Sequence, residues 1–226
     1  MQYTFGLFDD VPATPGAVRA IGSHAFVLEG YALPYVNDLL PLLDAIRRQA
    51  PVRHMITPGG FTMSVGLTNC GALGWTSDRH GYRYTAIDPL SGQPWPALPA
   101  LLRELAHDAA ATAGFANFHP DACLINHYAP GTRLSLHQDR DEAQLAEPIV
   151  SVSLGIPATF LFGGFERSDP TQRISLVHGD VVVWGGADRL RYHGVLPLKP
   201  AEHTLLGPWR INCTFRKAGH SINFSQ

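Results

Sequence analysis

Cysteine is scarce in this sequence of 226 residues, which contains only Cys70, Cys123 and Cys213 and no C-x-x-C pair. An odd number of widely spaced cysteines argues against a disulfide framework or a zinc ribbon and is typical of a reducing compartment. The chain also lacks an apolar run of about 18 residues and a basic and apolar secretory leader. We therefore expect a cytoplasmic protein with no membrane partner.

Lysine is almost absent, since only Lys199 and Lys217 stand among the 17 basic residues, and the formal net charge is −2. This charge argues against a globally basic nucleic-acid-binding domain. The excess of arginine has two explanations: a GC-rich genome, or guanidinium groups placed to bind carboxylates and phosphates. With 45% hydrophobic and 16% charged residues, the chain has enough apolar surface for a core, which excludes a disordered protein.

Hydrophobic spacing predicts helices over 34–50 and 99–113, a hairpin over 55–65, and a long polar loop over 68–96. The second half of the chain is a series of short strands separated by turn signals. The predicted strands are 121–128, 132–137, 148–155, 158–163, 173–177, 180–184, 190–196 and 209–216. Such spacing is typical of a sandwich or barrel of the jelly-roll or cupin kind. With two helices covering one sheet face, the fold class is α+β.

The pattern His-x-Asp has a different context at 137–139 and at 178–180. His137 and Asp139 follow an alternating strand, where residues i and i+2 point to the same side and can share one metal ion. His178-Gly179-Asp180 instead separates two apolar strands and is interpreted as a hairpin turn.

His193, on a late predicted strand, is the candidate third ligand. Two histidines and one carboxylate with open positions are the ligand set of non-haem Fe(II) oxygenases. The alternative is that His193 is an ordinary strand histidine.

Two predicted strands carry polar side chains on one face. In 209–216, alternation places Arg210, Asn212, Thr214 and Arg216 on one side, where they either face solvent or line an interior that holds a dianion. In 121–128, Asn126 and Tyr128 share a face and either bind the same anion or lie at a sheet edge.

The segment 75–84 combines Trp75, Tyr82 and Tyr84 with arginines. These aromatic side chains either stack on nucleobases or pack the loop onto the core.

Seven stretches together resemble one family, the AlkB family of Fe(II)- and 2-oxoglutarate-dependent nucleic-acid dealkylases, and its bacterial members in particular. The resemblance extends from about residue 53 to 216. The stretches are Thr57-Pro58-Gly59-Gly60, Asn69-Cys70-Gly71, Gly74-Trp75, Asn126-His127-Tyr128-Ala129-Pro130-Gly131, His137-Gln138-Asp139-Arg140-Asp141, Gly179-Asp180-Val181-Val182-Val183-Trp184-Gly185-Gly186 and Asn212-Cys213-Thr214-Phe215-Arg216.

The resemblance implies a double-stranded β-helix, a jelly-roll variant, with the N-terminal helices covering one sheet and a nucleotide-recognition hairpin as a lid. We expect a single dioxygenase domain over 1–226. Within it, about 1–25 would be an N-terminal arm, about 53–96 the substrate-recognition lid and loop, and about 121–217 the β-helix core.

The resemblance also implies roles for individual residues. The iron ligands, which are the catalytic residues, would be His137, Asp139 and His193. The residues that bind 2-oxoglutarate would be Asn126, Tyr128, Arg210, Asn212 and Arg216. The substrate contacts would be Trp75, Tyr82, Tyr84, Asp141 and Arg167, with Trp75 and the ring of His137 on either side of a flipped base. Local phosphate contacts would come from Arg79, Arg83, Arg133, Arg167 and Tyr82.

The implied activity is oxidative demethylation of bases such as 1-methyladenine and 3-methylcytosine in single- or double-stranded DNA, with RNA as a further substrate. It would use Fe(II), 2-oxoglutarate and O2, and release succinate and formaldehyde. An alkylated base pairs poorly, so flipping it out costs less. The alternatives are a 2-oxoglutarate-dependent hydroxylase of a small molecule or protein, and a catalytically silent cupin-like binding protein. We expect a monomer.

Overall fold

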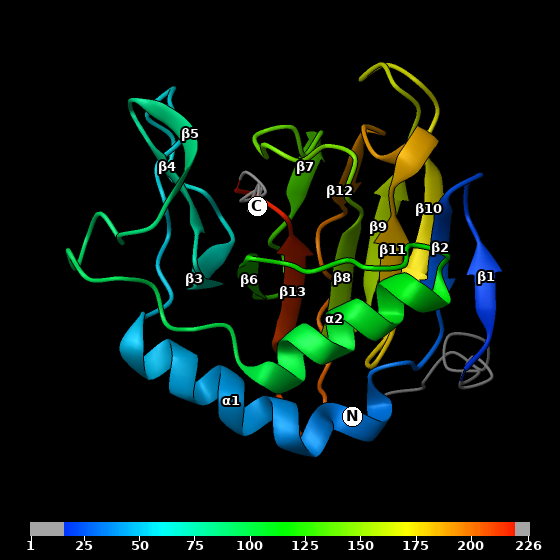
Figure 1. Ribbon diagram of the computed structural model, residues 1–226, viewed down its shortest axis with the longest axis horizontal. Helices are drawn as coiled ribbons and strands as arrows, with labels where there is room; N and C mark the ends of the chain where they lie inside the picture. The colour runs from blue at the N-terminus through cyan, green and yellow to red at the C-terminus, as the bar shows by residue number, and fades with distance from the viewer. Residues whose placement is uncertain (1–15, 220–226) are drawn as a thin grey trace, which may run out of the picture.

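The computed structural model describes residues 16–219 (Figure 1). The elements of the first half are β1 (Val18–Ala20), β2 (Ala25–Leu28), η1 (Leu33–Tyr35), α1 (Val36–Gln49), β3 (Gly66–Gly71), β4 (Gly74–Asp78), β5 (Gly81–Thr85) and α2 (Ala100–Thr112). Those of the second half are β6 (Ala122–Tyr128), β7 (Leu134–His137), β8 (Ile149–Gly155), β9 (Ala158–Phe162), β10 (Gln172–Leu176), β11 (Val181–Trp184), η2 (Gly186–Asp188), β12 (His193–Val195) and β13 (Arg210–Arg216). In the described part of the chain, no helix is long and apolar enough to cross a membrane.

Within residues 16–219, all strand pairs are antiparallel, and they form three sheets. The larger sheet has the order β1-β2-β11-β8-β13-β6-β3, and the smaller has the order β10-β9-β12-β7. Strands β4 and β5 form a separate two-stranded ribbon, which stands at the β3 end of the molecule, away from β1 (Figure 1). This is the jelly-roll architecture that the strand spacing predicts.

Both faces of the larger sheet are covered. Helices α1 and α2 cross its outer face, as Figure 1 shows, and their leucines pack against apolar residues such as Val152 and Phe215. On the inner face, Val182 packs with Phe160 and Leu176 of the smaller sheet. The prediction that the helices cover one sheet face is confirmed, because their apolar stripes have no other surface on which to bury.

The predicted helices and the eight strands of the second half are present, with ends that differ by a few residues. Helix α2 ends just before Gly114, whose φ of +90° suits glycine. The predicted N-terminal arm, about 1–25, is partly wrong. Residues 1–15 lie outside the described part, but β1 pairs with β2, and β2 pairs with β11. Strand β1 is exposed along its length, so it shows no hydrophobic alternation.

The predicted loop over 68–96 is wrong, because it contains most of β3 and all of β4 and β5. Strand β3 is buried on both faces despite its polar sequence. Its polar groups are satisfied inside: the Thr68 hydroxyl donates to the Ala50 carbonyl at 2.7 Å, and the Asn69 side chain pairs twice with the Trp75 backbone at 3.0 Å. A strand of this kind has no period-two signal to detect.

Two predicted turns differ from expectation. The hairpin over 55–65 reduces to a tight turn with one isolated bridge, between Ile56 and Thr62. The turn at Gly179 (φ +91°) is real, but it is not a hairpin, because β10 belongs to the smaller sheet and β11 to the larger. The turn at Gly179 connects β10 of the smaller sheet to β11 of the larger sheet.

Candidate active site

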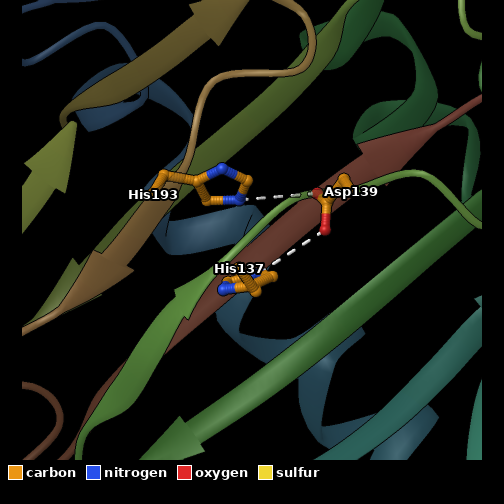
Figure 2. A group of neighbouring side chains, drawn as sticks. All are labelled: His137, Asp139 and His193. Carbon is orange, nitrogen blue, oxygen red and sulfur yellow. Dashed lines mark ion pairs between the residues drawn. The ribbon is translucent and has the colours of Figure 1, made fainter. Parts of the chain in front are cut away.

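Three side chains from two neighbouring strands meet between the sheets (Figure 2). His137 ends β7, Asp139 follows it, and His193 begins β12 directly opposite His137. The Nε2 atoms of His137 and His193 lie 3.6 and 3.7 Å from the two carboxylate oxygens of Asp139. One ligand atom from each residue lies within 4.8 Å of the other two. The structure thus brings together the three predicted iron ligands.

Backbone contacts fix which nitrogen of each histidine is free. The Nδ1 atom of His137 lies 2.9 Å from the Ser135 carbonyl, and that of His193 lies 3.0 Å from the Arg191 carbonyl. A carbonyl only accepts a hydrogen bond, so Nδ1 carries the proton in both rings. Both Nε2 lone pairs therefore point toward Asp139 and are available to a metal ion.

The charges of the cluster suit a divalent cation. Burial, together with the neighbouring His137, lowers the pKa of His193 to about 3, so its ring is neutral near pH 7. Burial of Asp139 opposes its ionisation, but the Arg216 guanidinium outweighs this effect and holds the pKa of that carboxyl well below its usual range. Neutral imidazole, ionised carboxylate and the absence of thiolate among the three ligands match Fe(II).

The polar face of β13 lines a cavity of about 530 Å³ that also holds the three ligands. Arg210, Asn212, Thr214 and Arg216 are all buried, so the alternative of a solvent-exposed strand face is wrong. Ile211, Cys213 and Phe215 pack on the opposite face, under the helices. Asn126 and Tyr128, on the neighbouring strand β6, line the same cavity.

The unpaired donors of Arg210 are the clearest indication of an anion-binding site. Its side chain is 2% exposed and lies over the Tyr128 ring, 5.1 Å from the ring centroid. One Nη atom donates to the Ser153 hydroxyl at 2.9 Å, but Nε and the other Nη have no partner among residues 16–219. A buried positive charge with unpaired donors attracts an anion such as a carboxylate, which accepts charged hydrogen bonds. The cavity therefore fits an acid such as 2-oxoglutarate.

The other predicted contacts of 2-oxoglutarate are partly engaged within the protein. The Asn212 amide donates to the Ser151 hydroxyl at 2.8 Å and to a backbone carbonyl. Arg216 donates twice to one oxygen of Asp139, at 2.9 and 2.6 Å. Arg216 thus contacts a candidate metal ligand directly.

Four of the five predicted substrate contacts line the cavity: Trp75, Tyr82, Asp141 and Arg167. Trp75 stacks on Tyr82 with ring centroids 5.4 Å apart, and its indole N–H donates to the Asp141 carboxylate at 3.0 Å. Arg167 donates to the Leu136 carbonyl at 2.6 Å. Tyr82 is 48% exposed, so this aromatic pair faces solvent at the cavity.

Tyr84 does not join this group. It does not line the cavity, and its hydroxyl donates to the carboxylate of Glu142, a lining residue, at 2.7 Å. Of the predicted phosphate contacts, Arg83 is paired with Asp78 at 2.6 and 2.9 Å. Sequence reasoning missed Glu142 and Arg189, which are buried and form an ion pair of 3.0 Å. The only indication in the sequence was that Glu142 is an acidic residue three positions after Asp139.

Comparison with known proteins supports the same assignment. The model of the 2OG-Fe(II) oxygenase superfamily matches residues 27–216. "Alpha-ketoglutarate-dependent dioxygenase AlkB" of Salmonella typhimurium is 57% identical over 207 residues, which is 92% of each chain. "DNA N(6)-methyladenine demethylase ALKBH1C" of Arabidopsis thaliana is 32% identical over 80% of this chain and 46% of its own.

A solved structure described as "The structure of OsALKBH1" matches 89% of this chain and 100% of its own, with a TM-score of 0.75 and 24% identity, which supports the fold. Sequence, fold and site geometry thus agree. The chain belongs to the 2OG-Fe(II) oxygenase superfamily and, within it, to the AlkB dioxygenases, which use Fe(II), 2-oxoglutarate and O2.

Proposed function

We propose that this enzyme removes methyl groups from N-alkylated bases of nucleic acid by oxidation. The overall reaction converts the N-methyl base, 2-oxoglutarate and O2 into the unmodified base, formaldehyde, succinate and CO2. One oxygen atom enters succinate and the other enters formaldehyde. The observation that carries the proposal is a cavity shared by the cation-binding cluster, a buried arginine with unpaired donors, and an exposed aromatic pair. The printed name of the Arabidopsis thaliana relative, a DNA demethylase, supports the nucleic-acid substrate.

His137, Asp139 and His193 would hold the iron, and bound Fe(II) would supply the activation of O2 that oxidises 2-oxoglutarate and the methyl group. Arg210 would bind one carboxylate of 2-oxoglutarate through its unpaired donors. Asn126, Tyr128, Asn212 and Arg216 would line the remainder of that subsite. Because Arg210 is buried, the cosubstrate must enter the cavity to reach it.

In substrate recognition, the protein would stack on the flipped base, orient it and neutralise its positive charge. Trp75 and Tyr82 offer aromatic faces at the cavity, and His137 supplies the opposite ring for a flipped base. Asp141, held by the Trp75 indole, places a carboxylate beside that position. Since 1-methyladenine and 3-methylcytosine are cationic, this carboxylate favours them. Arg167 would meet the edge of the base.

The finer features are also proposals. The enzyme would act on single- and double-stranded DNA and on RNA, as a cytoplasmic monomer of 24.6 kDa. Residues of about 53–96 would form the substrate lid and those of about 121–217 the catalytic core of a single domain. Two facts favour this division: the β4–β5 ribbon carries Trp75 and Tyr82, and the smaller and larger sheets carry His193 and Arg210, respectively.

The alternative, a hydroxylase of a small molecule or protein, shares the iron and cosubstrate residues and differs only at the substrate surface. Trp75→Ala separates the two. Under the proposal, it abolishes dealkylation while largely sparing 2-oxoglutarate decarboxylation in the absence of substrate. Equal loss of both activities would contradict a base-stacking role for Trp75.

The direct test is formaldehyde release from a single-stranded oligonucleotide with one 3-methylcytosine, in the presence of Fe(II), 2-oxoglutarate and ascorbate. The wild type should release formaldehyde, and His137→Ala should not. A wild-type protein that forms the visible Fe(II)–2-oxoglutarate band but releases no formaldehyde would support the hydroxylase. A protein that binds both without any turnover would support the binding-protein alternative.

A further inference from the structure

Four charged side chains form a buried cluster beside the candidate iron ligands: Asp139, Glu142, Arg189 and Arg216. Their side chains are 10%, 2%, 3% and 7% exposed. Two negative and two positive charges balance within the cluster. Burying four charges is costly, and a buried ion pair is by itself weak evidence of added stability. The contacts of these side chains indicate another role.

Glu142 joins three parts of the fold that lie far apart in the sequence. Its carboxylate accepts a hydrogen bond from the Tyr84 hydroxyl of β5 at 2.7 Å. The same group lies 3.0 Å from a nitrogen of Arg189, which follows η2, and 3.3 Å from Nε of Arg216, the last residue of β13. It is thus the common partner of the ribbon and of both arginines.

The two arginines in turn hold Asp139 by its side chain and its backbone. Arg216 donates twice to the Oδ2 atom of Asp139, at 2.9 and 2.6 Å. Arg189 donates to the Asp139 carbonyl at 2.6 Å. The rotation and position of this ligand therefore depend on two guanidiniums that share Glu142 as counter-ion.

The other end of the cluster reaches the aromatic surface, which is formed by Trp75 and Tyr82. Tyr84 lies opposite Trp75 in the β4–β5 pairing, and Tyr82, two residues earlier on the same face of β5, stacks on Trp75. A continuous set of polar contacts thus runs from the ribbon, through Tyr84 and Glu142, to Arg216 and Asp139. A movement of the ribbon when a base stacks on it would be transmitted along this set.

We propose that Glu142 is a positioning residue: it orients Asp139 for the metal ion and, through Tyr84, couples occupancy of the aromatic surface to the metal site. The second half of the proposal rests on the proposed function, and the first half does not. Glu142 contributes a further effect through its charge, because without it Arg189 and Arg216 would leave a net positive charge beside a cation site.

The first half is tested by titrating Mn(II) into the protein with 2-oxoglutarate but without nucleic acid. Glu142→Gln should weaken Mn(II) binding by about 10-fold or more, as is usual when an outer-shell partner is lost. Glu147→Gln is the matched control, since only the Glu147 backbone contacts Arg189, and it should change the affinity less than twofold. Wild-type affinity in a folded Glu142→Gln protein would overturn this half.

The second half is tested by reciprocal binding, because two coupled sites must each raise the affinity of the other by the same factor. A labelled oligonucleotide with one 3-methylcytosine is titrated anaerobically, with and without Mn(II) and 2-oxoglutarate. The wild type should bind it about fivefold more tightly, or better, when loaded. Tyr84→Phe, which removes only the hydroxyl, should bring this ratio close to one.

Tyr82→Phe is the control on the same ribbon, and it should retain the wild-type ratio even if both affinities change. A wild-type ratio of one, or an unchanged ratio in Tyr84→Phe, would overturn the coupling while leaving the proposed function intact. Failure of the loaded wild type to bind the oligonucleotide would instead contradict both the proposed function and the coupling. If Glu142→Gln fails to fold, the coupling can still be tested with Tyr84→Phe.

Discussion

His193 lies directly opposite His137 in the antiparallel pairing of β12 with β7, and their ring centroids are 4.4 Å apart. The pairing places two histidines that are 56 positions apart in the sequence beside one carboxylate. Each ring is held through Nδ1 by a backbone carbonyl two residues before it. The metal site is therefore built by strand register together with local backbone geometry.

This relationship predicts that His193→Ala weakens Mn(II) binding by more than about 100-fold, beyond the 10–100-fold typical of outer-shell changes. Calorimetric titration in the presence of 2-oxoglutarate measures the affinity. His178→Ala, in the His-x-Asp sequence at 178–180, is the control and should leave the affinity unchanged. Similar losses in the two variants would mean that the effect comes from folding and not from coordination.

Arg210→Lys should weaken 2-oxoglutarate binding by about 10–100-fold, because lysine keeps the charge but lacks the planar pair of donors, and charged hydrogen bonds contribute about 1.5–3 kcal/mol. The measurement is titration of the visible Fe(II)–2-oxoglutarate band, done anaerobically. Arg173→Lys, at an exposed position on β10, should bind 2-oxoglutarate as the wild type does. An unchanged affinity in Arg210→Lys would place the cosubstrate elsewhere.

Stability should rise with pH through the titration of His127. Burial, with the nearby Arg47, lowers the pKa of His127 to about 4 in the folded protein, against about 6.5 in the unfolded chain. Between these values the unfolded state binds more protons, so protonation favours unfolding as the pH falls. His127→Gln should reduce the slope of unfolding free energy against pH by up to about 1.4 kcal/mol per pH unit in this window.

Urea unfolding of both proteins at several pH values between 4 and 7 measures the two slopes. Parallel curves for the wild type and His127→Gln would show that His127 does not contribute to the pH dependence.

Gly179→Ala should destabilise the protein more than Gly131→Ala. Both glycines have positive φ, +91° and +83°, which costs an alanine about 1–2 kcal/mol. At Gly179 an added Cβ would also lie 2.6 Å from the Leu33 side chain, whereas at Gly131 it would meet nothing within 4 Å. Overpacking should therefore add about 1–3 kcal/mol at Gly179. Equal midpoints of urea unfolding for Gly179→Ala and Gly131→Ala would contradict this prediction.

The alternating strands of the second half were predictable because their polar and apolar side chains alternate with a period of two, even where both faces are buried. The strand from Arg210 to Arg216 is the clearest case, with polar residues on the cavity side and apolar residues under the helices. The pair His137 and Asp139 was identified for a similar reason, since two potential ligands separated by one residue need little tertiary information to come together.

Other features depended on contacts between distant residues. Strand β3 could not be recognised, because both its faces are buried and its polar groups are satisfied by partners such as Ala50 and Trp75. The sheet change at Gly179 depends on which strands pair on either side of it. The contact of Tyr84 with Glu142 spans 58 positions along the chain, and no local pattern encodes it.

The sequence by itself determined the strand pattern of the second half, the ligand types and the family. The tertiary structure alone decided which polar groups are paired and which are free: Arg216 is paired with Asp139, whereas two donors of Arg210 remain unpaired. The physical reason is that alternation encodes only which residues share a face and whether that face is polar or apolar. Hydrogen bonding and charge pairing inside that face depend on distances of a few ångströms, which are set when the sheets close around the cavity.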